Sequence, residues 1–208
     1  MPDRPGAPRR AWQRMLSGRR LDILDPSPLD VEIEDIAHGL ARVARWNGQT
    51  SGDHAFSVAQ HSLLVERILC LQNPEAAHRD RLATLLHDAP EYVIGDLISP
   101  FKVVIDETYR LIEERLHQAV RLRFGLPGNL PLAMRQRIKK ADQAAAYFEA
   151  QALAGFSETE AGRYFGRPGA IRVEQISALI QPWPTKQAET RFLKGFRSVA
   201  AATMAETA

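Results

Sequence analysis

The chain has 208 residues, of which 45% are hydrophobic and 25% charged, a balance typical of a folded globular protein and not of a disordered one. This length suits one domain rather than two. The single cysteine, Cys70, excludes an intrachain disulfide and a multi-cysteine zinc site, so any metal must be held by His, Asp and Glu. No segment reaches the roughly 18 apolar residues of a membrane-spanning helix, and no targeting segment is evident, so we expect a cytoplasmic protein with no membrane partner.

The net charge of +2 is distributed unevenly along the chain. Residues 1–20 hold six arginines and one acid, Asp3, so the remaining chain sums to −3. We predict a flexible basic tail over residues 1–14 and a single domain over residues 15–204. Such a tail could touch nucleic acid, but a solvated, proline-containing chain end is the commoner explanation, so we do not expect a nucleic-acid partner.

The apolar spacing predicts an all-α domain. Ser17-Gly18 could close a small hairpin between residues 12–15 and 21–24. Beyond it, apolar residues recur at intervals of three and four, as in amphipathic helices, and no run of alternating strand residues remains. Asn47-Gly48, Pro74, Pro90 and later Gly and Pro residues separate the periodic segments. The predicted helices cover residues 30–44, 57–71, 75–89, 103–124, 131–155 and 185–204, with a loop at 92–102.

Residues at the ends and on the apolar faces of these helices suggest a metal site. His87 and Asp88 place an imidazole and a carboxylate side by side, and both His61 and Asp142 lie on apolar helix faces. A lone inward histidine is usually a hydrogen-bonded core residue, whereas a buried carboxylate needs a cation or dense hydrogen bonding. Together the four offer two nitrogen and two oxygen ligands, a set that suits divalent Mn, Co, Fe or Zn without ranking them.

The order His61, His87-Asp88, Asp142 resembles the HD-domain superfamily of metal-dependent phosphohydrolases. The similarity extends to Arg45-Trp46, to SVAQHS at residues 57–62 and to HDAPEYVIGDLISPFK at residues 87–102. These segments are similar to the branch of small bacterial 5′-deoxynucleotidases and related deoxynucleotide phosphohydrolases. The resemblance covers roughly residues 30–154. It implies an HD-domain helical bundle, four metal ligands in His61, His87, Asp88 and Asp142, and a homodimer, a state common among such relatives.

The resemblance also assigns catalytic roles. Glu91 would be the proton-transfer group for the water or the phosphate, and Asp96 would lie beside the attacking water or the sugar hydroxyl. Glu91 follows His87 by about one helical turn, which keeps it within hydrogen-bond reach of the same site. The alternative for Glu91 is an exposed carboxylate in a turn.

Four residues are predicted to bind substrate. Arg45 and Lys102 would neutralise phosphoryl oxygens, and Trp46 would contribute to selection of deoxyribose. His54 lies in a predicted loop and could reach the substrate. Plainer alternatives are a helix-end arginine, a core tryptophan and a surface histidine. Superfamily members with two metals need extra histidines between the HD pair and the last Asp, where this chain has only His117, so we expect one metal.

These observations predict a hydrolase that removes phosphate from deoxynucleoside 5′-monophosphates by metal-activated water. One alternative is a deoxynucleoside triphosphate phosphohydrolase using the same site. A second is a non-enzymatic, metal-stabilised helical module that binds nucleic acid through its tail. A phosphodiesterase of cyclic or dinucleotides is less favoured because the extra histidines are missing.

Overall fold

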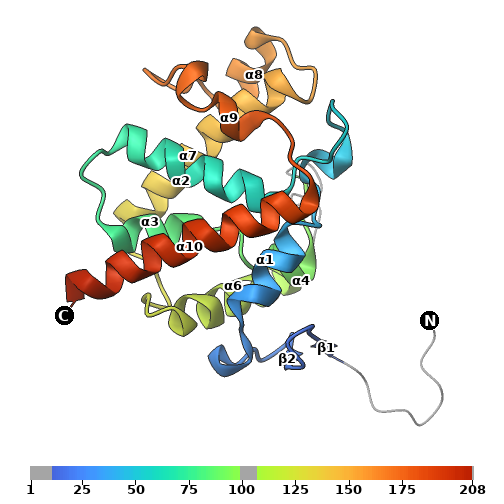
Figure 1. Cartoon of the computed structure of the whole chain (residues 1–208), viewed down its shortest axis with the longest axis vertical. Helices are drawn as coiled ribbons and strands as arrows, with labels where there is room; N and C mark the ends of the chain where they lie inside the picture. The colour runs from blue at the N-terminus through green and yellow to red at the C-terminus, as the bar shows by residue number, and fades with distance from the viewer. Residues whose placement is uncertain (1–10, 99–106, 208) are drawn as a thin grey trace, which may run out of the picture.

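Helices dominate the computed structural model, which describes residues 11–98 and 107–207 (Figure 1). The strands in this part of the chain form one antiparallel hairpin, in which β1 (Trp12–Arg14) pairs with β2 (Arg20–Asp22). The all-α prediction and the small N-terminal hairpin are therefore confirmed. β1 falls inside the span predicted as a flexible tail. Its strand is held by pairing with β2 and by the Arg20 guanidinium, which lies 4.6 Å from the Trp12 ring centroid. The predicted tail therefore overlaps the predicted hairpin, and the structure follows the hairpin over residues 12–14.

The helices, in chain order, are α1 (Ile33–Leu40), α2 (Val58–Gln72), α3 (His78–Leu85), α4 (Glu91–Ile94), α6 (Glu107–Arg123), α7 (Leu132–Ala152), α8 (Glu158–Phe165), α9 (Ser177–Ile180) and α10 (Thr185–Thr207). Short 3₁₀ turns lie at Pro28–Asp30, Arg45–Gly48 and Val173–Gln175. The predicted helices at 57–71, 131–155 and 185–204 match α2, α7 and α10 to within a few residues.

Three predicted boundaries differ from the structure. The first predicted helix ends at Leu40 rather than at residue 44, and the predicted helix 75–89 shortens to α3. After α3 the chain continues in tighter, 3₁₀-type turns, because the amides of His87 and Ala89 donate to the carbonyls three residues earlier, those of Thr84 and Leu86. The predicted loop at 92–102 overlaps α4, which ends at Gly95 with a φ of 78°, a conformation that glycine adopts without strain.

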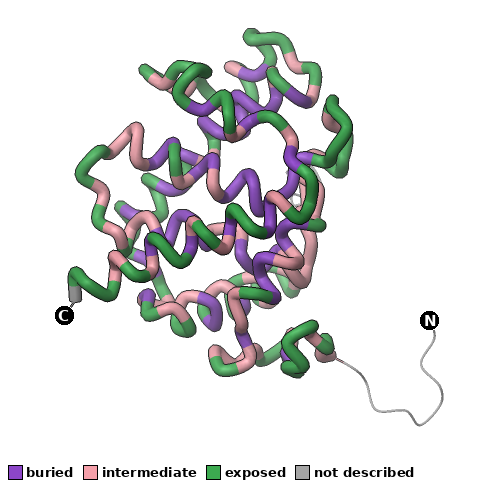
Figure 2. Tube along the Cα trace, in the orientation of Figure 1, coloured by how far each residue is buried: buried purple, intermediate pink, exposed green. Residues whose placement is uncertain are grey.

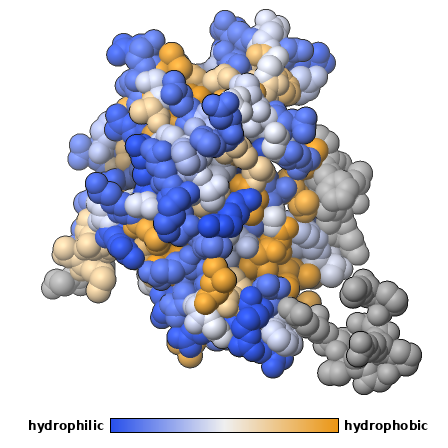
Figure 3. Space-filling view, turned by 45° about the vertical axis from the view of Figure 1, so that its right-hand side comes forward, coloured by the Kyte–Doolittle hydropathy of each residue, from blue (hydrophilic) through white to orange (hydrophobic). Residues whose placement is uncertain are grey.

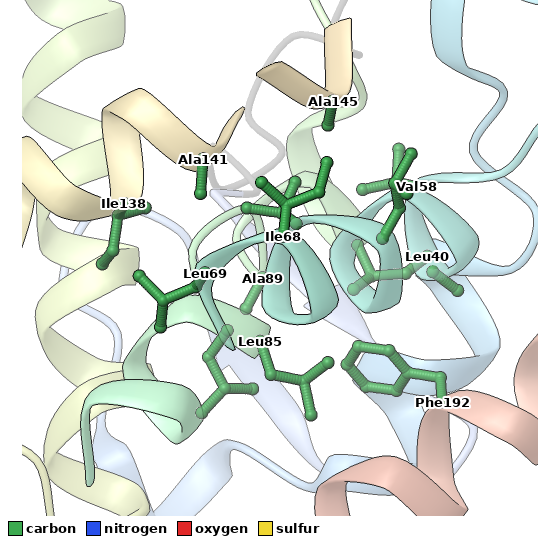
Figure 4. Packing of buried hydrophobic residues seen from close by; sticks show 14 of the residues in the cluster. Leu40, Val58, Ile68, Leu69, Leu85, Ala89, Ile138, Ala141, Ala145 and Phe192 are labelled. Carbon is green, nitrogen blue, oxygen red and sulfur yellow. The ribbon is translucent and has the colours of Figure 1, made fainter. Parts of the chain in front are cut away.

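Helix α2 lies at the centre of the fold and contacts α3, α7 and α10 (Figure 1). Figure 2 shows buried positions along α2 and along the faces that its neighbours turn toward it. Ile68 and Leu69 of α2 meet Ile138 and Ala141 of α7 in this core, with Leu85 close by (Figure 4). The predicted apolar faces therefore do meet, and this packing brings the helices that carry the chemistry together.

The first turn of α2 is tied to a distant segment by the buried side chain of Gln60. Its Nε2 donates to the carbonyls of Leu179 and Gln181 at 2.8 and 2.6 Å, and its Oε1 accepts from the amide of Trp183 at 3.0 Å. Gln60 immediately precedes His61, so the α9–α10 connection fixes the helix end that presents this histidine. The C-terminal region thereby supports a site whose motifs all lie before residue 155.

The outer surface in Figure 3 is mostly hydrophilic, with separate hydrophobic areas between the polar ones. Exposed large apolar residues include Leu16 in the hairpin turn, Leu29 in the first 3₁₀ turn and Leu132 at the start of α7. No helix in residues 11–98 and 107–207 combines the length and the apolar character needed to cross a membrane.

Candidate metal centre

Three elements bring the four predicted ligands together. His61 projects from the first turn of α2, which Ser57 caps by accepting a hydrogen bond from the amide of Gln60. His87 and Asp88 follow α3 in the tight turns before Pro90, and Asp142 lies on α7. His61 is fully buried, and the Asp88 and Asp142 side chains are 21% and 23% exposed. The cluster is therefore buried on the side of His61 and partly accessible to solvent on the side of the two aspartates.

The ligand atoms of His61, His87 and Asp88 lie close together, and Asp142 contacts His61. Nε2 of His61 lies 3.3 Å from both Asp88 Oδ2 and Asp142 Oδ1. Nε2 of His87 lies 3.2 Å from the same Asp88 oxygen. His61, His87 and Asp88 each offer a ligand atom within 4.8 Å of the others, so this group could hold a metal ion.

The hydrogen bonds of the two imidazoles define which nitrogen faces this group. His61 Nδ1 lies 2.5 Å from Glu149 Oε1, and His87 Nδ1 lies 2.9 Å from the carbonyl oxygen of Thr84. Both partners are acceptors, so each Nδ1–H donates to its partner and the Nε2 of each ring faces the centre. This is the usual arrangement of metal-binding histidines, whose other nitrogen donates to a carboxylate or a carbonyl.

A cation would relieve the repulsion between the imidazole Nε2 atoms and the carboxylate oxygens that face them. Neither buried Nε2 makes a hydrogen bond within the described part of the chain, and both point at carboxylate oxygens. Two lone pairs at this separation repel unless a proton or a metal ion lies between them. The residues present thus fit a divalent ion with mixed nitrogen and oxygen ligands.

The charges of the centre favour the same conclusion. Burial and the nearby Arg45 guanidinium lower the pKa of His61, but the surrounding carboxylates outweigh both and hold it well above its usual value. Burial raises the pKa of Asp88, yet the imidazoles of His87 and His61 outweigh burial and keep this pKa well below its ordinary value. The carboxylates are therefore anionic at neutral pH and attract a cation, which is a proton on His61 when no metal is bound.

Glu149 is a member of the site that the sequence reasoning missed. Its side chain is fully buried in α7, where it bonds His61 Nδ1 and accepts from the indole N–H of Trp46 at 2.9 Å. Arg45 Nε lies 3.6 Å from Glu149 Oε2. Burial raises the pKa of Glu149, but His61 and Arg45 outweigh it and hold the pKa below its usual value. The glutamate thus links His61, a candidate metal ligand, to the Arg45-Trp46 pair.

Arg45 and Asp96, predicted to bind phosphate and to assist catalysis, form an ion pair beside the centre. Arg45 Nη1 lies 3.1 Å from Asp96 Oδ2, and their side chains are only 16% and 4% exposed. Burial opposes the charge of Arg45, but Glu149, Asp96 and the metal-site carboxylates hold the pKa of the guanidinium above its already high value. Arg45 is therefore a permanent cation within the field of the cluster.

Trp46 lies in a strained turn next to Arg45. Trp46 and Asn47 have φ values of 58° and 51°, the left-handed region that residues other than glycine seldom adopt. The Arg45 amide donates to the carbonyl of Phe56 at 2.8 Å, which anchors this turn to the start of α2. The Trp46 ring packs against Phe156 and Phe165, with centroids 5.8 and 5.6 Å away. Trp46 thus helps build the wall of the site, and its contact with substrate stays a prediction.

The remaining predicted residues differ in their placement. Glu91 is 3% exposed at the start of α4, so the alternative of an exposed turn carboxylate does not hold for it. Its amide donates to the carbonyl of Asp88 at 3.0 Å, which places it directly after the metal ligands. His54 is exposed in the loop before α2, as the surface alternative anticipated. Lys102 lies outside the described residues.

Comparison with known proteins relates most of the chain to a bacterial protein. No family model matches the chain. An uncharacterized protein of Rhodobacter capsulatus is 58% identical over 180 residues, which cover 86% of this chain and 92% of that protein. Identity at this level over nearly the full length of both proteins means that they share one fold. The chain therefore belongs to the same family as this Rhodobacter capsulatus protein.

Proposed function

We propose that the protein is a metal-dependent phosphohydrolase that removes phosphate from deoxynucleoside 5′-monophosphates by metal-activated water. The observation that carries this proposal is the close group of His61, His87 and Asp88, with Asp142 against His61, next to a buried arginine and further buried acids. A purely structural metal site would not need the additional charged groups. Phosphoryl transfer uses all of them, because it depends on positioning and on neutralising phosphoryl charge.

The protein side chains would divide the work as follows. His61, His87, Asp88 and Asp142 would hold one divalent ion, either Mn, Co, Fe or Zn. Such an ion lowers the pKa of a water molecule and polarises a phosphoryl oxygen. In this proposal Glu91, buried one turn from the ligands, takes the proton of the attacking water or gives a proton to the leaving oxygen.

Arg45 and Asp96 would orient the substrate. The guanidinium is held by Asp96 and Glu149, so it can offer its remaining N–H groups to phosphoryl oxygens without changing its position. Trp46 would contact the sugar edge, where a 2′-hydroxyl would find no space. Lys102 would add a second cation for the phosphate, and His54 would reach the substrate from the neighbouring loop.

Two other functions compete with this one. Deoxynucleoside triphosphates could use the same site, and a non-enzymatic module would keep the metal for structure and bind nucleic acid through the arginine tail. The buried Arg45–Asp96 pair beside the cluster favours the enzyme over the module. A cytoplasmic location and a homodimer complete the proposal and can be checked by cell fractionation and light scattering.

A phosphate-release assay tests the proposal. The protein, freed of metal and then supplied with Mn, Co, Fe or Zn, is given deoxy- and ribonucleoside mono-, di- and triphosphates. We expect release from deoxynucleoside monophosphates and none from the His87→Ala variant, whose helical circular dichroism should match the wild type. Release from triphosphates alone would favour the first alternative. Salt-sensitive binding of DNA without hydrolysis of any nucleotide would favour the module.

A further inference from the structure

A cleft of about 170 Å³ opens directly beside the metal centre, between α6 and α7. His87 and Asp142 form one side of this cleft, so it adjoins the metal ligands. The other lining residues have no role in the proposed reaction. They are Ala83, His117, Arg121, Leu130, Arg135, Ile138 and Lys139. Typical sites for small organic ligands measure about 300–1,000 Å³. The cleft is therefore suited to a group the size of a phosphate rather than to a nucleoside.

The lining of the cleft is strongly basic. Arg121, Arg135 and Lys139 bring three cations, and Asp142 is the one carboxylate. Arg135 and Lys139 are four residues apart on α7, so this helix presents two cations on one face; His117 and Arg121 share a face of α6 at the same spacing. The like charges of Arg135 and Lys139 at this spacing destabilise the helix. Their placement beside the cleft is therefore a cost that an anionic ligand would offset.

The cations of the cleft are only partly neutralised by the protein. Arg121 is largely buried and bonds the Gly128 carbonyl and Glu114 through a single atom, Nη1, at 2.9 and 3.2 Å. Arg135 makes no ion pair within residues 11–98 and 107–207. Burial, and to a smaller extent the charge of Arg135, lower the pKa of the Arg121 guanidinium against the opposing effect of Glu114. Lys139 Nζ lies 3.2 Å from Asp142 Oδ2, which joins the basic wall to the metal ligands.

We propose that this cleft is a second anion site, which binds a phosphate group that the metal does not coordinate. Arg121 and Arg135 would donate to its oxygens, since guanidinium groups form the strongest hydrogen bonds to phosphate. The bound group is either free phosphate released at the metal centre or a further phosphate of a substrate chain. The place of this group in a reaction rests on the proposed function, whereas the affinity of the cleft for phosphate does not.

Binding of inorganic phosphate and pyrophosphate to the purified full-length chain, without added metal, tests the site. Arg135→Gln removes one cleft cation from an exposed position of α7 and should leave the fold intact. Lys140→Gln makes the same charge change at an exposed α7 residue that does not line the cleft. By calorimetric titration, Arg135→Gln should weaken binding by about tenfold or more, the loss of one charge-assisted hydrogen bond. Lys140→Gln should change it by less than about twofold, the small effect of an exposed charge.

Equal weakening in the two variants, or no binding to the wild type, would overturn the proposal, since a diffuse positive surface would then account for any affinity. Steady-state kinetics separates the two sources of the phosphate group. A substrate chain predicts that Arg135→Gln raises KM for a deoxynucleoside triphosphate more than for the monophosphate, whereas released product predicts a higher inhibition constant for inorganic phosphate. If Arg135-dependent binding persists while the wild type hydrolyses no nucleotide, the proposed function fails and the anion site stands.

Discussion

The carboxylate behind His61 should control how tightly the centre binds metal, and Glu149→Gln tests this. Glu149 is fully buried and receives two N–H groups, from His61 Nδ1 and from the Trp46 indole. Glutamine has nearly the same size but only one accepting oxygen. One of the two N–H groups must then face the amide NH₂, a donor, and the negative charge that holds the imidazole is lost.

The structure sets the size of the effect. A hydrogen bond to a charged partner contributes about 1.5–3 kcal/mol. Loss of the group that orients a metal-binding histidine typically weakens metal affinity by about 10- to 100-fold. We therefore expect Zn²⁺ or Mn²⁺ to bind Glu149→Gln about 10- to 100-fold more weakly than the wild type. The free energy of unfolding of the metal-free variant should fall by about 1–3 kcal/mol, because a buried donor is left unpaired.

Competition with a chromogenic chelator measures the affinity, and Glu189→Gln is the matched control. Glu189 is a nearly buried carboxylate on α10 that accepts from Arg42 at 3.0 Å and Lys186 at 2.9 Å, with no contact to the metal ligands among the described residues. The control should lose stability without losing metal affinity. Unchanged affinity in Glu149→Gln, or an equal loss in both variants, would refute the role assigned to Glu149.

Three further outcomes are expected. In Gly39→Ala the new Cβ would lie 2.8 Å from Tyr92 Cβ and 2.9 Å from the Tyr92 carbonyl oxygen, so the free energy of unfolding, measured with denaturant, should fall by about 1–3 kcal/mol. The control Gly162→Ala, whose new Cβ has no neighbour nearer than 3.9 Å, should be neutral or slightly stabilising. Equal effects of the two substitutions would contradict this packing. Burial first, and then Glu66, raise the pKa of Cys70 to about 11. Alkylation of this thiol by iodoacetamide should therefore be slow at pH 8 and become faster as the pH rises toward that pKa. Fast alkylation at pH 7 would contradict the raised pKa. Removal of a bound divalent metal by a chelator should lower the melting temperature, since saturation at 100 times Kd contributes about 2.7 kcal/mol, and an unchanged temperature would speak against a metal site.

The sequence could predict that His61 and Asp142 point into the core because helix periodicity decides which side chains point inward. His61 and Asp142 fall on apolar faces, and α2 and α7 pack against each other in the structure as those faces require. The same reasoning could have found Glu149. It lies seven residues after Asp142, two turns along the same helix, within the otherwise uncharged stretch of residues 143–148 and 150–154. A buried glutamate in such a stretch needs a partner as much as a buried aspartate does.

Other features depended on contacts that no local pattern encodes. Trp46 donates to a residue 103 positions away, and the left-handed turn that places it there is a tertiary effect. Helix α8 had a local signal, because Ser157 and Glu160 form a capping box, but its eight residues give too short a periodic pattern to stand out. Helix α9, with four residues, had none, yet the carbonyls around it bind Gln60 and so support the metal site.

The balance of buried charge argues for a divalent ion rather than a proton as the resident cation. Asp88, Asp142, Glu149 and Asp96 surround one buried guanidinium, that of Arg45. With both histidines neutral, these five groups sum to −3. A proton on one imidazole brings the sum to −2 and satisfies one Nε2, whereas a divalent ion brings it to −1 and satisfies both. Since buried charge is costly unless it is compensated, a divalent ion would offset more of the charge of these five groups than a proton would.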